Sequence, residues 1–366
     1  MAEKRTAYTS TLICTVGTSL LSNLRRAERD PDRANPIKLV KELQALDQSE
    51  KLLGAEINSN HSIMAQGRLS EPEKLFLCVS ETADGLLSGR LLERFYAAQF
   101  AQTQAITIEG LQTEDPRRFR DHGLRNLVRT IADIVRQERA RGREPLINAT
   151  GGFKAQISFA GLVGQVLEVP VFYQFESFRD VIELPPLPIS FSFDYWLDHF
   201  EQLNALSQDL VPEAEVRPGL EEVLLLREEG LCCLSSLGEL FHRGYLERFR
   251  RNKVNLLPPP AAASGTERKI GDQIKDKHHG RHKGLDLYLE RLLREAGYIT
   301  QISTVFYDRA LSKQNRFFVS SKCEANQIEG WYSEGKELTK FICTTTARSA
   351  GERQAAIVDL TERFIT

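Results

Sequence analysis

Short apolar runs rich in β-branched residues alternate with longer amphipathic stretches through roughly the first half of the chain. The runs predict buried strands at Ser10–Val16, Lys74–Ser80, Ala105–Ile108, Pro145–Ala149, Val169–Gln174 and Val181–Leu184. The stretches between them predict helices near Pro36–Leu53, Gly85–Phe100, Leu124–Arg141 and Gln156–Leu167. Strands that alternate with helices are typical of an α/β domain, whose mostly parallel sheet is covered by helices on both faces.

The pattern changes after Leu184, where prolines interrupt it and a helix-dominated stretch begins at Phe191–Leu206. The segments that follow have the pattern of short helices with tight connections: Leu220–Glu228, Ser235–Arg243 and Gly244–Arg251. This arrangement predicts a small winged helix-turn-helix unit. Pro258–Gly265, with the sequence PPPAAASG, cannot build a core and predicts an extended, exposed linker.

The end of the chain follows a third pattern. Gly284–Ala296 predicts an amphipathic helix and Glu352–Phe364 a closing helix. Between them, strands are predicted at Tyr298–Phe306, Arg316–Lys322, Gln327–Tyr332 and Thr339–Thr345. We therefore expect an α/β domain at residues 1–190, a winged helix-turn-helix at 191–255, a linker at 256–280 and a small α+β domain at 281–366.

The composition, with 41% hydrophobic and 27% charged residues, is that of a globular protein. No apolar run approaches the roughly 20 residues that cross a bilayer, and Met1–Ser10 lacks the apolar stretch of a signal peptide. We therefore expect a cytoplasmic protein with no membrane partner. The six cysteines include no CxxC pair, so we expect reduced thiols and no metal site.

Two short loops of the first half are candidates for binding an anion. Gly17-Thr18-Ser19 follows the first predicted strand, and Thr150-Gly151-Gly152-Phe153-Lys154 follows the fourth. Glycine lets the backbone approach a phosphate closely, and N–H groups at a helix start stabilise negative charge. The alternative is that these glycines serve only strand-to-helix turns. Neither GxGxxG after the first strand nor GxxxxGK[ST] occurs, which argues against a dinucleotide dehydrogenase and an NTPase.

The two loops lie within the segments Thr15-Val16-Gly17-Thr18-Ser19-Leu20-Leu21 and Asn148-Ala149-Thr150-Gly151-Gly152-Phe153-Lys154. Taken as a pair, these segments resemble the CRISPR-associated Rossmann fold (CARF) of type III defence systems. The resemblance implies a Rossmann-like homodimer that binds cyclic oligoadenylate, with cyclic tetra-adenylate as the expected activator. The two loops would form its binding site.

The same resemblance implies that Ser19 and Lys154 position and cleave the cyclic ligand. In-line attack of a ribose 2′-OH needs alignment and a cation that offsets the developing phosphate charge, which Lys154 supplies without a metal. No histidine lies in either loop, so we expect ring opening to be slow at best.

Several cations lie in or beside the predicted C-terminal strands, and we take five as candidates for RNA cleavage: Arg309, Lys313, Arg316, Lys322 and Arg348. A helix, antiparallel strands and an arginine after the last strand resemble the RelE family of toxins. That resemblance implies an mRNA interferase that works on ribosomes without a metal, its cations stabilising the phosphorane-like state. The patterns of HEPN ribonucleases and metal-dependent nucleases are missing from this part of the sequence. The alternative is a set of scattered surface cations.

For two segments the sequence allows more than one functional interpretation. The cluster Lys275–Lys283 is a phosphate contact, the end of a solvated linker, or a histidine-based zinc site. The helix-turn-helix binds nucleic acid through its arginines or a protein, such as a ribosomal protein, through its leucines. We expect a ribonuclease that cyclic oligoadenylate activates and that cleaves mRNA on ribosomes. The rivals are a ring nuclease that degrades cyclic tetra-adenylate and a ligand-controlled transcription regulator.

Overall fold

The computed structural model describes residues 10–69, 71–184, 192–261, 268–270, 282–311, 313–334 and 336–365. The chain divides into two compact units. The first contains Met1–Phe191 and Leu206–Glu247, and the second contains Ser192–Ala205 and Arg248–Thr366. Within the described ranges, no helix combines the length and the apolar character needed to span a membrane.

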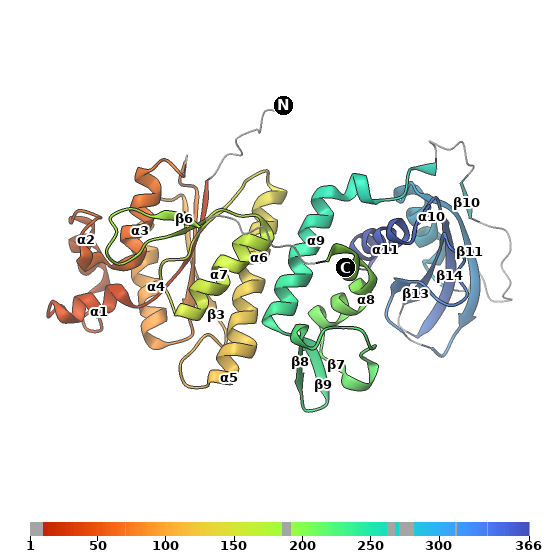
Figure 1. Cartoon of the computed structure of the whole chain (residues 1–366), viewed down its shortest axis with the longest axis horizontal. Coiled ribbons are helices and arrows are strands. Elements are labelled where there is room, and N and C mark those ends of the chain that lie inside the picture. Colours follow the sequence, from red (N-terminus) through yellow and green to blue (C-terminus); the bar gives the residue numbers. More distant parts are fainter. Residues whose placement is uncertain are drawn as a thin grey trace. The chain divides into compact units, whose positions relative to one another are not determined.

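A six-stranded sheet, of which Figure 1 labels β3 and β6, forms the centre of the first unit. The order of its strands is β3-β2-β1-β4-β5-β6. Its strands are β1 (Thr11–Thr15), β2 (Lys74–Ser80), β3 (Gln102–Ile108), β4 (Leu146–Asn148), β5 (Val171–Tyr173) and β6 (Ile182–Leu184). The first five are parallel, and β6 pairs antiparallel with β5. The predicted α/β fold with a mostly parallel sheet is therefore confirmed.

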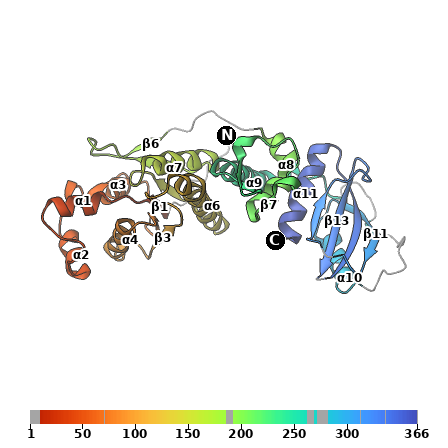
Figure 2. The same cartoon turned by 90° about the horizontal axis from the view of Figure 1, so that it is seen from below.

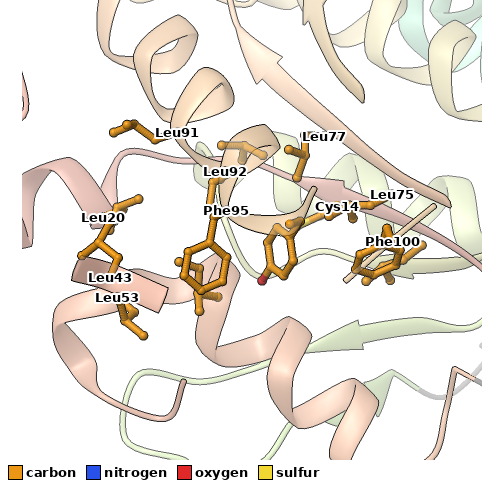
Figure 3. Packing of buried hydrophobic residues seen from close by; sticks show 14 of the residues in the cluster. Cys14, Leu20, Leu43, Leu53, Leu75, Leu77, Leu91, Leu92, Phe95 and Phe100 are labelled. Carbon is orange, nitrogen blue, oxygen red and sulfur yellow. The ribbon is translucent and has the colours of Figure 1, made fainter. Parts of the chain in front are cut away.

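Helices cover both faces of this sheet. The first face carries α1 (Ser19–Arg26), α2 (Pro36–Gln44), α3 (Gly54–Ala65) and α4 (Ala83–Tyr96). The second face carries α6 (Leu124–Ala140) and α7 (Lys154–Leu167). Figure 2 shows β1 and β3 between α4 and α6. Successive residues of β1 point to opposite faces, so Cys14 packs into the first core, part of which Figure 3 shows, and Ile13 into the second.

The helices before β2 differ from the prediction. The expected helix at Pro36–Leu53 ends at Gln44, and only a short 3₁₀ turn, η1 (Lys51–Leu53), follows it. The helix α1 was expected only as a helix start after Gly17-Thr18-Ser19, without bounds, and α3 was not expected. The apolar periodicity of α3 is weak because four of its buried side chains are polar, namely Glu56, Ser59, Asn60 and Ser62. A helix that buries polar groups is not predicted from apolar periodicity, because it has no continuous apolar stripe.

The segment after Leu206 also differs from the prediction. A small antiparallel sheet has the order β7-β9-β8, with β7 at Val211–Pro212, β8 at Leu225–Glu228 and β9 at Leu231–Leu234. The two short helices expected on either side of Gly244 are one helix, α9 (Ser236–Leu256). A Cβ at Gly244 would collide with Cγ1 of Val166 on α7. This glycine therefore serves the close approach of two helices and marks no turn.

The second unit contains a five-stranded sheet in the order β10-β11-β14-β13-β12. Its elements are β10 (Lys269–Ile270), α10 (Leu285–Glu295), β11 (Ile299–Asp308), β12 (Arg316–Phe318), β13 (Gln327–Glu334), β14 (Glu337–Thr345) and α11 (Ala350–Phe364). The four strands β11 to β14 pair antiparallel, as expected, and β10 pairs parallel with β11. The helix α8 (Phe193–Gln208) precedes these elements in the chain.

The expected linker is only partly described. Its beginning is only partly exposed: Pro260 is exposed, but Pro258 and Ala261 are buried, and the Ala261 N–H donates to the Gly297 carbonyl at 2.9 Å. Of the basic cluster Lys275–Lys283, only His282 and Lys283 lie within the described residues. His282 is buried, and its Nδ1 forms a hydrogen bond with the Thr339 hydroxyl at 2.8 Å. This histidine belongs to the folded unit.

Candidate functional site

The strands β1 and β4 are parallel neighbours, with Cys14 paired to Asn148. Their carboxyl ends therefore lie at one edge of the sheet, where ligands of open α/β sheets collect. Gly17-Thr18-Ser19 leaves β1 and leads into α1, and Thr150–Lys154 leaves β4 and leads into α7. The structure thus brings the two predicted loops together.

The backbones of these loops are in close contact. A Cβ at Gly17 would lie 2.7 Å from the amide nitrogen of Gly152 and 3.2 Å from its Cα, so no side chain fits there. Gly152 has a φ of +110°, which L side chains rarely adopt. Position 17 therefore requires glycine because of the close approach of the two backbones, and position 152 requires it because of its positive φ.

A buried carboxylate that the sequence interpretation missed lies between the loops. The N–H of Gly17 donates to Glu56 Oε1 at 2.6 Å, and the Ser19 hydroxyl donates to Glu56 Oε2 at 3.1 Å. A Cβ at Gly151 would collide with the same carboxylate. Glu56 is 1% exposed, and its burial raises the pKa of the carboxyl group above its ordinary value, although the Gly17 N–H opposes the shift.

This contact changes the roles expected for two predicted residues. The Gly17 N–H is directed at Glu56, and the Ser19 hydroxyl lies between Glu56 and the Ala55 N–H, which donates to it at 2.8 Å. In this structure Ser19 therefore holds α1 to the start of α3. The available sequence signal was the set Glu56, Ser59 and Asn60, whose spacing of three and four residues places them on one side of a helix.

Asn148 at the end of β4 fixes the second loop. Its side-chain amide donates to Ser59 Oγ at 2.7 Å and to Asn60 Oδ1 at 2.6 Å. Its Oδ1 accepts from both the N–H and the hydroxyl of Thr150. Thr15 of β1 adds a hydrogen bond from its hydroxyl to the Gly151 carbonyl at 2.6 Å. The loop is therefore preorganised by buried polar groups of β1, β4 and α3.

The start of α7 combines a fixed backbone with an exposed cation. The Phe153 N–H donates to Gln156 Oε1 at 3.2 Å, while Gln156 Nε2 donates to the Cys78 carbonyl of β2. The Phe153 ring contacts Phe119 edge to face, with ring centroids 5.3 Å apart. Lys154 is exposed, and its ammonium has no ion-pair partner within the described part of the chain. This edge can therefore offer an anion the Lys154 charge and the positive end of the α7 dipole.

The five cations predicted for RNA cleavage do not form one cluster. Arg309 and Lys313 follow β11, whereas Lys322 follows β12 and Arg348 follows β14. In an antiparallel sheet these loops lie at opposite ends, because Asp308 pairs with Leu338 and Ile299 with Thr345. The seven residue steps from Leu338 to Thr345 correspond to about 24 Å. One bound phosphate therefore cannot contact both ends of the sheet.

Arg316 lies between these ends, at the start of β12. Its guanidinium carbon lies 3.7 Å from the centroid of the Trp331 ring, and its Nη1 lies 3.6 Å from Glu201 Oε1 of α8. The contact with Trp331 could not be predicted from the sequence, because β12 and β13 pair only in the folded sheet. Arg316 is thus placed on an aromatic side chain.

Two arginines of the segment predicted as a helix-turn-helix, Arg243 and Arg250, form ion pairs within their units. Arg243 pairs with Asp133 at 2.7 Å and with Glu239 at 3.0 Å in the first unit. Arg250 pairs with Glu362 at 2.5 Å in the second. These contacts hold Arg243 and Arg250 to acidic side chains of their own units, whereas Arg248 and Arg251 of the same helix are exposed.

Comparison with solved structures gives matches of low identity, among them Can2, Csm6 and protein VC1899. Can2 from Sulfobacillus thermosulfidooxidans, in complex with cyclic tetra-adenylate, is 13% identical over 68% of this chain and 68% of that chain, with a TM-score of 0.25. Enterococcus italicus Csm6, bound to cyclic hexa-2′-fluoro-hexa-dAMP, is 10% identical over 55% of this chain and 49% of that one, with a TM-score of 0.27. Protein VC1899 from Vibrio cholerae is 11% identical over 93% of this chain and 78% of that chain, with a TM-score of 0.26.

Comparison with protein families gives a match for part of the chain. Residues 51–187 match the family described as CRISPR-associated protein (Cas_APE2256). The matched stretch includes α3 with Glu56, and the loop Thr150–Lys154 with the start of α7. Over this stretch, which contains most of the candidate site, the chain is similar to a family of CRISPR-associated proteins.

Proposed function

We propose that the first unit is a CARF domain that binds a cyclic oligoadenylate, with cyclic tetra-adenylate as the preferred candidate. The observation that carries the proposal is the contact between Gly17 and Gly152, which joins two strand-to-helix loops at one edge of a parallel sheet. The match of residues 51–187 to a CRISPR-associated family supports the same assignment. A cyclic ligand with several phosphates would receive the Lys154 charge and the α7 dipole from each copy of a homodimer.

The second unit would supply the output as a ribonuclease. Its order of elements, α10, four antiparallel strands and α11, agrees with the expectation of a small α+β domain of the RelE kind. Under this proposal the unit cleaves mRNA on ribosomes without a metal, and ligand binding to the first unit activates it. Its candidate cations are Arg309 and Lys313 at one end of the strands, Lys322 and Arg348 at the other end, and Arg316 between them.

One assay tests the proposal directly. Purified ribosomes carrying mRNA are incubated with the protein, with and without cyclic tetra-adenylate, and both the mRNA and the fate of the ligand are followed. We expect mRNA cuts only when the ligand is present. Absence of heat in calorimetry with cyclic tetra- and hexa-adenylate would exclude the ligand assignment.

A ring nuclease is the second candidate, and the exposed Lys154 at the start of α7 favours it. In-line attack of a ribose 2′-OH on its own phosphodiester needs an aligned backbone and a nearby cation, and Lys154 is placed to supply the cation. Linearised ligand without mRNA cleavage in the same assay would support this function alone. Slow linearisation together with mRNA cleavage would indicate an effector that limits its own activation.

A further inference from the structure

Alternating aromatic and basic side chains form a row across the C-terminal sheet. The strand pairing places Phe306 of β11 opposite Lys340 of β14, Lys340 opposite Trp331 of β13, and Trp331 opposite Arg316 of β12. Directly opposed residues project from the same face of a sheet. Phe318, two residues beyond Arg316 on β12, extends the same face. We call these five side chains the aromatic–basic row.

Cation–π contacts connect the row from one member to the next. Lys340 Nζ lies 5.1 Å from the centroid of the Phe306 ring and 4.5 Å from that of the Trp331 ring. The Arg316 guanidinium carbon lies 3.7 Å from Trp331 and 4.3 Å from Phe318. These distances are within the range of cation–π attraction. Each cation is thus held between two rings, which keeps the row ordered.

The row projects from the face of the sheet that is opposite the core. Neighbouring residues in the strands point the other way: Phe341 and Phe317 are buried and contact each other, and Phe341 also contacts Tyr288 of α10. In the row, Phe306 is 39% exposed, and its neighbour Val305 is 41% exposed. The other members are half-buried. Aromatic side chains with this exposure contribute less to the core and remain accessible to a ligand.

Two carboxylates accompany the row. Glu329 Oε1 accepts a hydrogen bond from Trp331 Nε1 at 2.7 Å, which fixes the orientation of the indole ring. Glu201 Oε1 lies 3.6 Å from Arg316 Nη1, and the Glu201 side chain is 28% exposed and that of Arg316 37%. An ion pair of this length and exposure contributes little stability, so a phosphate can replace Glu201 as the partner of Arg316.

We propose that the aromatic–basic row is a binding platform for single-stranded RNA. Accessible rings on the face of a sheet stack on unpaired bases, and interleaved cations contact the phosphates that connect them. Phe306 and Trp331 are two strand spacings apart, about 10 Å, so separate bases occupy them. A duplex does not offer the faces of its bases, and the platform therefore selects single strands. Arg316 acts here in binding, as a residue stacked on Trp331.

The inference takes its RNA substrate from the proposed function, but its test needs neither activator nor cleavage. The full chain is titrated with a short single-stranded 2′-O-methyl oligonucleotide, which a 2′-OH mechanism cannot cut. Trp331 is a built-in reporter, since the only other tryptophan of the sequence is Trp196, which is fully buried. We expect binding to quench the tryptophan emission and a duplex of the same sequence to bind more weakly.

Variants separate stacking from charge. Trp331→Ala should weaken binding by about five- to 150-fold, which is the effect of losing one stacked base, while Trp331→Phe should retain most of it. Lys340→Ala should reduce the salt slope by about 0.7, as expected for one lost phosphate contact to a single strand. The matched control is Arg294→Gln, which removes an exposed cation from α10 and should change neither quantity.

Phe306→Ala and Lys340→Ala keep the test valid if Trp331→Ala does not fold, because neither residue belongs to the buried core. Unchanged affinity in both variants would overturn the proposal, as would equal binding of single strand and duplex, or equal competition by polyglutamate. RNA binding with quenching, but without ligand-dependent cleavage, would refute the proposed function and leave the platform in place.

Discussion

The amide of Gly17 donates a hydrogen bond of 2.6 Å to the buried carboxylate of Glu56, which also accepts a hydrogen bond from the hydroxyl of Ser19. This carboxylate stabilises the turn after β1 from inside the protein. An anion outside the turn is therefore left with the exposed Lys154 and the start of α7 as its main attractions. The two loops differ in kind: the first is held by an internal acid, and the second provides the positive charge.

Replacing Gly17 by alanine should separate the two loops. The new Cβ would lie 2.7 Å from the Gly152 nitrogen, and the backbone must move to relieve the clash. We expect a loss of about 1–3 kcal/mol in the free energy of unfolding and at least tenfold weaker binding of cyclic tetra-adenylate. Urea denaturation and calorimetry measure the two effects.

The control for this variant is Gly161→Ala within α7, where the nearest atom to the new Cβ is 3.9 Å away. Alanine favours a helix over glycine by up to about 1 kcal/mol, so this variant should be neutral or stabilised and should bind normally. Equal behaviour of the two variants would contradict the importance of the Gly17–Gly152 contact.

Glu56 should give the protein a specific pH dependence. Burial raises the pKa of this carboxyl group in the folded state, so the folded protein binds more protons than the unfolded chain above the ordinary pKa of 4.5. Its contribution to the free energy of unfolding is therefore fully present below that pH and falls as pH rises through the raised pKa. Glu56→Gln, which is neutral at every pH, should become more stable relative to the wild type as pH increases.

Urea denaturation of the wild type and of Glu56→Gln at a series of pH values measures this difference. A difference in unfolding free energy that is constant with pH, or that changes in the opposite direction, would show that the pKa of Glu56 is not raised in the folded protein. Glu50→Gln serves as the control, because this nearby side chain is exposed.

Lys154→Ala should weaken binding of cyclic tetra-adenylate by about tenfold or more, since a hydrogen bond to a charged group contributes about 1.5–3 kcal/mol. Lys154→Arg keeps the positive charge and should retain most of the affinity. Turnover of the ligand should decrease in Lys154→Ala beyond the loss in binding, and rates at saturating ligand distinguish the two effects. Unchanged turnover would remove this lysine from ring opening.

Gly244→Ala should destabilise the first unit by about 1–3 kcal/mol, because its Cβ would collide with Val166 where α9 passes α7. Shortening the opposing side chain in Gly244→Ala/Val166→Ala should recover part of that loss, and a double-mutant cycle in urea measures the coupling. If Gly244 instead marked a turn between two short helices, the second substitution would add its own cost without any recovery.

The sequence by itself determined the α/β class of the first half, since runs such as Lys74–Ser80 are buried on both faces and leave a clear apolar signature. It also located the two loops, because glycines directly after predicted strands are visible without a fold. The antiparallel strands of the C-terminal unit followed from the same kind of local pattern.

Only the tertiary structure decided what lies between and across these elements. Glu56 comes from a helix without an apolar stripe, and Gly244 resembles a turn residue until α7 is placed against it. The row through Lys340 and Trp331 depends on strand register, and the separation of Arg309 from Arg348 depends on which ends of the strands the loops join. Local periodicity reports how a segment is buried, whereas contacts between distant segments arise from packing that no single segment encodes.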